Sequence, residues 1–234
     1  MNQKCLRCQQ VFEQTIKWND LWSLKRIFSE VVCEKCQSQF ERCDVSQKNI
    51  CQYCQHPIEQ GDSCLDCQHW LKLYDDNYLQ QEAIYYYNAA FQEWIVDYKY
   101  HGDTRQAAVM LAILNDYYHK YKDYQWIILP SSPKSLQQRG FIPAEYLLQQ
   151  AKIPYTLLLN YKGDGKKQAK KNKQERLALE QPFELNLKEK LPNKILIFDD
   201  VYTTGTTLIR AKQLLFEHGV NHCMSLTLAR DLLV

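Results

Sequence analysis

The residues with the most specific chemistry lie near the end of the chain, in the run Ile195–Leu208. This run reads as an apolar strand, then Asp199 and Asp200, then threonines around Gly205, then the start of a helix. Backbone N–H groups and hydroxyls in such a turn present hydrogen-bond donors to an anion, and the helix N-terminus adds partial positive charge. The paired carboxylates suit ribose hydroxyls or a hydrated Mg²⁺ beside that anion.

A ligand that carries a phosphate next to a diol fits both halves of this run, and phosphoribosyl pyrophosphate (PRPP) is such a ligand. The alternative interpretation is an ordinary strand-to-helix turn with a threonine cap. Capping accounts for one threonine, but not for two adjacent acids followed by four hydroxyls around a glycine. The candidate PRPP-binding residues are Asp199, Asp200, Thr203, Thr204, Gly205, Thr206 and Thr207.

Eight of the ten cysteines form four Cys-x-x-Cys pairs, which supply enough thiolates for two tetrahedral zinc sites. The simplest arrangement closes one site with the first two pairs and another with the last two. An interleaved arrangement also agrees with the spacing, and we expect one or two structural zinc ions. The candidate metal ligands are Cys5, Cys8, Cys33, Cys36, Cys51, Cys54, Cys64 and Cys67.

The composition narrows the class of protein. With 45% apolar and 24% charged residues, the chain is expected to fold into a soluble protein. A net charge of +2 is too small to indicate a nucleic-acid partner by itself. No apolar run approaches membrane-spanning length, and no apolar leader follows Met1, so we expect a cytoplasmic protein without a membrane span. Cysteines in that reducing compartment favour metal over disulfides.

Strand-like and helix-like segments alternate after Trp70, which predicts an α/β fold with a parallel sheet and flanking helices over residues 71–234. A small cysteine-rich domain over residues 1–70 precedes it, with apolar helical spacing between Cys8 and Cys33 that suits a helical insertion or a partner-binding face. The candidate PRPP run then lies at the carboxyl end of a strand, where open α/β sheets bind ligands. The expected strands are Ala83–Tyr87, Gln125–Leu129, Tyr155–Asn160, Lys194–Asp199 and His222–Ala229, and the expected helices are Asn88–Tyr100, Arg105–Tyr121, Ser135–Ala151 and Thr206–His218.

Two further segments carry groups that suit anions. Ser131 and Ser132 form a short polar loop after a predicted strand, and Arg139 downstream is either a phosphate ligand or a helix-surface arginine. Lys162–Lys173 contains six lysines and one aspartate. We expect a mobile loop that closes over pyrophosphate, contacts a single-stranded DNA backbone, or is simply solvated. The candidate DNA-binding residues are Lys166, Lys167, Lys170 and Lys171.

The run around Asp199 resembles the PRPP-binding signature of type I phosphoribosyltransferases, with Tyr202 where many members carry an aliphatic residue. Four paired cysteine motifs, then Lys99–Gly102, Arg139–Phe141 and Gln168–Phe183, then this signature, occur in that order in the ComF family of late-competence proteins. The chain resembles that family over nearly its whole length.

The resemblance implies a type I phosphoribosyltransferase fold behind a double zinc ribbon. It also implies that Ser131, Ser132 and Arg139 form the pyrophosphate loop, and that Mg²⁺ binds with PRPP. The implied role is natural transformation, in which incoming single-stranded DNA moves into the cytoplasm alongside a ComFA-type helicase. Recruitment to the inner face of the membrane, at the DNA-uptake machinery, is part of that expectation.

Two other readings stay open at this point. A salvage enzyme would transfer ribose 5-phosphate to a nucleobase, although no base-recognition segment is evident in the sequence. A zinc-ribbon scaffold would leave the PRPP signature without a purpose. The acceptor substrate and the turnover of PRPP are not determined by these residues, since a fold does not determine a function.

Overall fold

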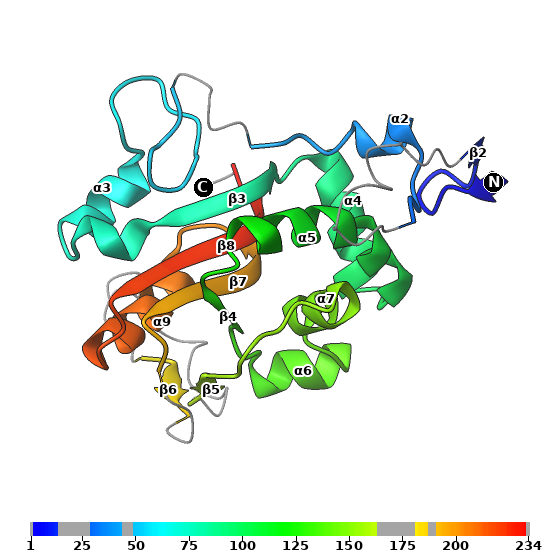
Figure 1. Cartoon of the computed structure of the whole chain (residues 1–234). Coiled ribbons are helices and arrows are strands. Elements are labelled where there is room, and N and C mark those ends of the chain that lie inside the picture. Colours follow the sequence, from blue (N-terminus) through cyan, green and yellow to red (C-terminus); the bar gives the residue numbers. More distant parts are fainter. Residues whose placement is uncertain (1, 14–28, 44–48, 163–180, 187–190, 233–234) are drawn as a thin grey trace.

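The computed structural model describes residues 2–13, 29–43, 49–162, 181–186 and 191–232 (Figure 1). Among these residues, four strands form a parallel sheet in the order β3-β8-β7-β4. Its strands are β3 (Gln81–Tyr86), β8 (His222–Arg230), β7 (Lys194–Tyr202) and β4 (Gln125–Ile128). The parallel sheet predicted from the alternation of elements is therefore confirmed.

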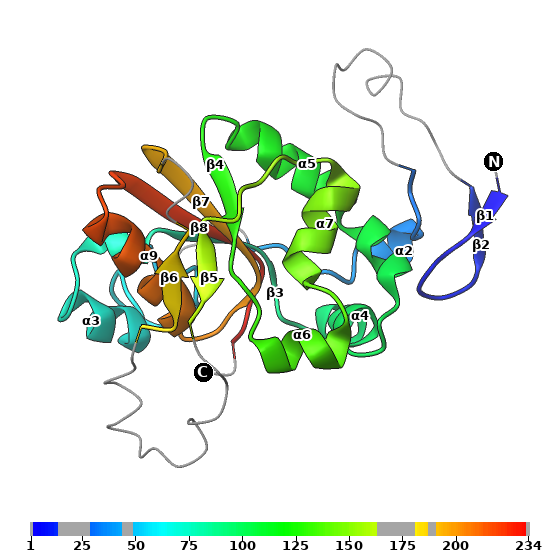
Figure 2. The ribbon, with the colours of Figure 1, turned by 90° about the horizontal axis from the view of Figure 1, so that it is seen from below.

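Helices cover both faces of this sheet, as predicted (Figure 2). On β7, Leu196 and Phe198 face one hydrophobic cluster, whereas Ile195 and Ile197 face the other, because successive side chains of a strand point to opposite sides. The first cluster is covered by α4 (Ala89–Lys99), α5 (Leu111–Lys120) and α7 (Pro143–Ala151), and the second by α9 (Thr206–Glu217).

The sequence explains where the helices begin. The Asn88 side chain accepts a hydrogen bond from the Phe91 N–H at 3.0 Å and caps α4. Ser132 likewise caps α6 (Pro133–Arg139), and Pro133 occupies the first helical position, where its missing N–H costs nothing. These caps fix where the two helices leave the carboxyl ends of β3 and β4.

Three expected elements differ from the structure in helix type, continuity or strand pairing. The helix expected over 105–121 is a 3-10 helix, η2 (Thr104–Val109), followed by α5. The helix expected over 135–151 is divided into α6 and α7, because Gly140 adopts φ 76° and ends the first of them. The strand expected over 155–160 contributes only a bridge between Thr156 and Ile127, and β5 (Leu159–Tyr161) instead pairs antiparallel with β6 (Phe183–Leu185).

The cysteine pairs lie on two similar modules. In the first, a hairpin of β1 (Asn2–Lys4) and β2 (Val11–Glu13) is followed by the short helix α2 (Glu34–Gln37). The second ends in α3 (Leu65–Leu71), which leads into the 3-10 helix η1 (Asp76–Leu79). The two modules lie at opposite ends of the molecule in Figure 1.

Each module packs on a different face of the sheet. Cys5 and Cys36 belong to the hydrophobic cluster under α4 and α5, and all four cysteines of the second module belong to the cluster under α9. Arg42 bridges Tyr85 antiparallel, so the segment between the modules covers the outer edge of β3. The division at residue 70 stays a prediction, since residues on both sides of it share these clusters. None of the helices in the described ranges has the length and apolar character needed to cross a membrane.

Candidate functional site

The two aspartates lie where β7 extends beyond its neighbour. The pairing of β7 with β4 ends at Phe198, whereas its pairing with β8 continues to Tyr202. The strand is therefore longer than the predicted Lys194–Asp199. Asp199 and Asp200 lie in its last part, beyond the point where β4 ends. This part of β7 is at the carboxyl end of the parallel sheet, where ligands of such folds bind.

Asp200 forms an ion pair with Lys99, the last residue of α4. Lys99 Nζ lies 2.6 Å from Asp200 Oδ2, and the two side chains retain 19% and 13% exposure. Lys99 belongs to the Lys99–Gly102 motif of the family resemblance, but its residue type and position did not predict a place in the site. The only sequence signal for this role was that motif, because the contact joins residues 101 positions apart.

Groups around Asp199 shift the pKa of its carboxyl in both directions. Burial and the charge of Asp200 raise the pKa of Asp199 to about 7, while the Asp200 N–H and the charges of Lys99 and Arg139 oppose this rise. The Asp200 N–H donates to Asp199 Oδ1 at 2.9 Å. A carboxyl with such a pKa is sensitive to any additional cation or hydrogen-bond donor that enters the site.

The loop after β7 has the shape of an anion cradle. Gly205 adopts φ 79°, and a Cβ at this position would lie 2.2 Å from Tyr202 Oη. The position therefore excludes every side chain. Among the described residues no side chain caps α9, so its first N–H groups remain available to a ligand. Thr203 and Thr207 are exposed, and the Thr204 and Thr206 hydroxyls lie 2.9 Å apart.

The predicted pyrophosphate residues lie at the end of the neighbouring strand. Ser131 and Ser132 follow β4, and the Ser132 hydroxyl accepts from the Ser135 N–H at 3.2 Å. Arg139 Nε donates to the Ser135 carbonyl at 3.2 Å, and the guanidinium is near enough to Asp199 to affect its pKa. The structure thus brings together side chains from β7, α4 and α6, although Ser132 already serves as a helix cap.

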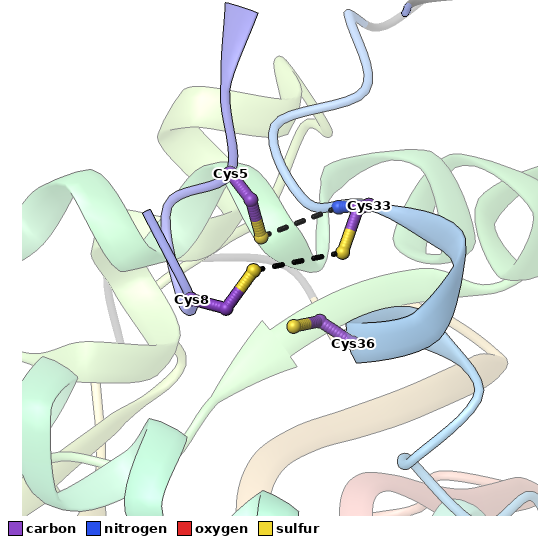
Figure 3. Close-up of side chains that lie close together, drawn as sticks. All are labelled: Cys5, Cys8, Cys33 and Cys36. Atoms are coloured by element: carbon purple, nitrogen blue, oxygen red, sulfur yellow. Dashed lines mark hydrogen bonds between the residues drawn. The ribbon is translucent and has the colours of Figure 1, made fainter. Parts of the chain in front are cut away.

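The first cysteine group joins the first two pairs, in the consecutive arrangement (Figure 3). Cys5 and Cys8 come from the turn after β1, and Cys33 and Cys36 from the start of α2. The Sγ atoms of Cys8 and Cys33 are 3.8 Å apart, and the Cys33 N–H donates to Cys5 Sγ at 3.3 Å.

The second group joins Cys51, Cys54, Cys64 and Cys67, all of them buried. The Sγ atoms of Cys54 and Cys64 are 3.6 Å apart. The turn at Cys51 and Cys54 has the same local geometry as the turn at Cys5 and Cys8. Gln9 follows Cys8 and Gln55 follows Cys54, and both have φ 61°. The Gln9 N–H donates to the Cys5 carbonyl, and the Gln55 N–H donates to the Cys51 carbonyl, each at 2.9 Å.

Both donor sets fit zinc. Within each group the ligand atoms all lie within 4.8 Å of one another. Sulfurs at about 2.3 Å from a tetrahedral zinc ion are about 3.8 Å apart, close to the observed spacing. Burial and neighbouring thiols raise the pKa of Cys36 to about 12, whereas backbone N–H groups lower that of Cys5 to about 6 despite burial. Four thiols this close ionise together only around a cation, and the two groups could hold two zinc ions.

The four candidate DNA-binding lysines, Lys166, Lys167, Lys170 and Lys171, lie outside the described residues. Helices α4 and α5 also carry tyrosines near lysines, a combination that suits single-stranded DNA. Most of these tyrosines are used within the fold. Tyr98 is fully buried and donates to the Pro143 carbonyl at 2.7 Å, and Tyr121 donates to Glu82. Tyr100, which directly follows α4, retains 70% exposure.

The fold and the site together define a phosphoribosyltransferase domain. The model of the family described as "Phosphoribosyl transferase domain" matches residues 135–231, which include most of α6 and all of β7, the loop and α9. The comparison with individual proteins extends further along the chain.

Competence protein ComFC of Streptococcus pneumoniae (strain ATCC BAA-255 / R6) is 35% identical over 227 residues, which cover 97% of this chain and 100% of that protein. Competence protein ComFC of Bacillus subtilis (strain 168) is 30% identical over 220 residues, which cover 92% of this chain and 89% of that protein. The chain belongs to the ComFC family of competence proteins. The family resemblance seen in the sequence is thereby confirmed.

Proposed function

We propose that this chain is a competence protein that assists the entry of single-stranded DNA into the cytoplasm and that it binds PRPP in doing so. The observation that carries the proposal is the likeness to two competence proteins, which covers 97% and 92% of this chain and therefore extends well beyond the phosphoribosyltransferase domain. A likeness restricted to the phosphoribosyltransferase domain would support only a shared fold.

The geometry supports PRPP as the ligand. The N–H groups and hydroxyls of Thr203–Thr207 would hold the 5-phosphate at the start of α9, and Asp199 and Asp200 would accept hydrogen bonds from the ribose 2- and 3-hydroxyls. Ser131, Ser132 and Arg139 would face the pyrophosphate, where a bound Mg²⁺ would neutralise phosphate charge. Lys99 balances the charge of Asp200 near the same edge.

The DNA-binding part of the proposal depends on charge. The four candidate lysines at 166, 167, 170 and 171 would contact phosphates of single-stranded DNA, and a ComFA-type helicase would act beside the protein at the inner face of the membrane. This arrangement would place the protein in the cytoplasm. The zinc modules would hold the N-terminal part of the chain against the sheet.

A genetic test separates DNA uptake from nucleobase salvage. Deleting the gene in a naturally transformable host should lower transformation by linear chromosomal DNA and leave growth on supplied nucleobases unchanged. Restoring the gene should restore transformation. Normal transformation together with failure to use one nucleobase would contradict the proposal and favour a salvage enzyme, in which the same acid pair and loop would bind PRPP.

A second experiment asks whether the PRPP site matters for uptake. Changing both Asp199 and Asp200 to Asn keeps the side-chain shape but removes two negative charges. If ligand binding is part of uptake, transformation should fall while protein abundance and zinc content stay normal. Calorimetry with PRPP and Mg²⁺ on the purified proteins shows whether the variant has lost the ligand. Full transformation by a variant that no longer binds PRPP would show that the fold acts without its ligand.

A further inference from the structure

Three successive carbonyl groups, from Tyr202 at the end of β7 to Thr204 in the loop before α9, accept hydrogen bonds from buried side chains. Arg230 Nη1 donates to the carbonyl oxygens of Tyr202 at 3.3 Å and of Thr203 at 2.8 Å. Trp70 Nε1 donates to the carbonyl oxygen of Thr204 at 2.8 Å. Both donors are buried, with 0% and 6% exposure for Arg230 and Trp70.

These contacts determine where the loop's N–H groups point. In a planar trans peptide, the carbonyl of one residue and the N–H of the next point in opposite directions. Carbonyls of residues 202–204 that point inward therefore direct the N–H groups of residues 203–205 outward. Outward N–H groups at the start of α9 are the donors that an anionic ligand needs.

Both donors connect the loop to the second cysteine group. Trp70 follows Cys67 by three residues on α3, so the two side chains share one face of this helix. The Arg230 guanidinium lies 4.9 Å from the centre of the Tyr202 ring. Tyr202 belongs to the same buried cluster as Cys51, Cys54, Cys64 and Cys67, so its ring lies between the guanidinium and the surroundings of that group.

A zinc ion with four thiolates has a net charge of −2 and would compensate the buried guanidinium. Arg230 has no carboxylate partner among the ion pairs of the described residues, and its Nε and Nη2 atoms are buried there without a hydrogen-bond partner. An isolated buried charge is strongly unfavourable, whereas a charge near an opposite one is tolerated. The metal centre would therefore stabilise the arginine that holds the loop.

We propose that the metal centre formed by Cys51, Cys54, Cys64 and Cys67 sets the shape of the anion-binding loop through the positioning residues Trp70 and Arg230. The first cysteine group has no such connection among the described residues, since its cluster lies on the other face of the sheet. The identity of the ligand as PRPP rests on the proposed function. The coupling between the metal centre and the loop is independent of that identity.

The substitution Trp70→Phe removes the N–H donor and keeps an aromatic ring. We expect PRPP affinity to fall about tenfold, because a buried carbonyl loses its partner and the loop loses its preferred shape. Zinc content should remain at that of the unaltered protein. The matched control is Trp94→Phe, which removes a hydrogen bond to the Gln106 carbonyl at 3.0 Å on the opposite face of the sheet. The control should leave PRPP affinity unchanged.

A ligand-free measurement distinguishes failure of the coupling from failure of the proposed ligand. Amide order parameters from NMR should fall for Thr203–Thr206 in Trp70→Phe but not in Trp94→Phe. The conservative variant Arg230→Lys keeps the charge but loses the planar donor group, and it should loosen the same amides. If the unaltered protein does not bind PRPP, the ligand assignment is wrong, and the NMR comparison still tests whether Trp70 and Arg230 hold the loop. Unchanged order parameters in both loop variants would overturn the coupling.

Discussion

At the scale of single residues, the candidate site contains a glycine under a steric constraint and an aspartate under an electrostatic one. Gly205 cannot be replaced by a larger residue without strain, because its φ is 79° and the Tyr202 hydroxyl occupies the space of a Cβ atom. Asp199 is difficult to ionise, because it is half-buried beside another carboxylate. Each constraint leads to a measurable prediction.

Gly205→Ala should destabilise the fold and abolish PRPP binding. A positive φ costs an alanine about 1–2 kcal/mol, and the clash with Tyr202 adds to that cost by displacing the loop. Gly219→Ala is the matched control, since Gly219 has φ 89° and nothing lies within 4 Å of an added Cβ. Urea unfolding and PRPP calorimetry should show a smaller loss of stability for the control and normal binding. Equal effects of both changes would remove the argument for close packing at Gly205.

Asp199→Asn should change how stability depends on pH. Because the folded-state pKa of Asp199 is about 7 and its ordinary value is 3.8, the folded chain holds more protons here between these values. The free energy of unfolding therefore falls as pH rises through this window. Each tenfold change in the ionisation constant corresponds to about 1.4 kcal/mol before solvent screening.

The measurement compares urea unfolding of the unaltered protein and of Asp199→Asn at about pH 5.5 and about pH 8. The variant should gain stability relative to the unaltered protein at the higher pH. Other groups, including the cysteines, titrate in both proteins and cancel in the difference. A difference that is the same at both pH values would mean that Asp199 ionises at its ordinary pKa.

At the scale of elements, the two cysteine modules have similar local geometry but different surroundings. Cys8 of the first module is exposed, whereas all four sulfurs of the second lie in the cluster beneath α9. The helix N-termini at Cys33 and Cys64 favour thiolates in both modules. We therefore expect the two modules to bind zinc with similar affinity. Loss of zinc from the second module should lower the stability of the protein more than loss from the first.

Cys64→Ser should lower Tm more than Cys33→Ser does. The unaltered protein should contain two zinc ions, and each variant should contain one. Losing the ion from the second module also leaves buried thiols in the hydrophobic cluster, so we expect a loss of several kcal/mol, on the order of 10 °C in Tm. Elemental analysis and calorimetry provide the two measurements. Absence of zinc from the unaltered protein would contradict the assignment of both modules.

At the scale of the whole molecule, the two faces of the sheet contribute different parts of the proposed PRPP site. One face carries α4, whose last residue contacts the acid pair, and the other carries α9, whose first turn would bind the phosphate. The candidate DNA contacts lie in a part of the chain with dense positive charge, although the net charge of the protein is only +2. Binding to DNA should therefore depend on a local segment rather than on total charge.

Changing Lys166, Lys167, Lys170 and Lys171 to Gln should weaken the salt dependence of single-stranded DNA binding. Each phosphate contact contributes about 0.7 to the slope of log affinity against log salt, so the slope should change by up to about 3. A control variant removes the same charge from four exposed lysines elsewhere, Lys35, Lys72, Lys122 and Lys134. Fluorescence anisotropy at several salt concentrations measures both. Identical slopes for the two variants would indicate non-specific attraction to net charge.

Much of the fold followed from local patterns. The spacing of the cysteines indicated that eight of them could bind two metal ions, and the alternation of apolar strands with amphipathic helices predicted the parallel sheet. The run around Asp199 and Gly205 predicted a strand, a tight loop and a helix, because each of these depends on residues that are neighbours in the chain. Local patterns also led to the wrong prediction of one helix over residues 135–151. The apolar spacing of this segment looks continuous, but the left-handed turn at Gly140 divides it into two helices.

Only the tertiary structure decided which distant residues meet at the site. Lys99 reaches Asp200 across 101 positions, and Trp70 reaches Thr204 across 134. The pairing of the cysteines into consecutive groups was likewise one of two arrangements that the spacing allowed. Such contacts depend on the order of strands in the sheet and on which face each helix covers. These are properties of the packed chain, and no local periodicity encodes them.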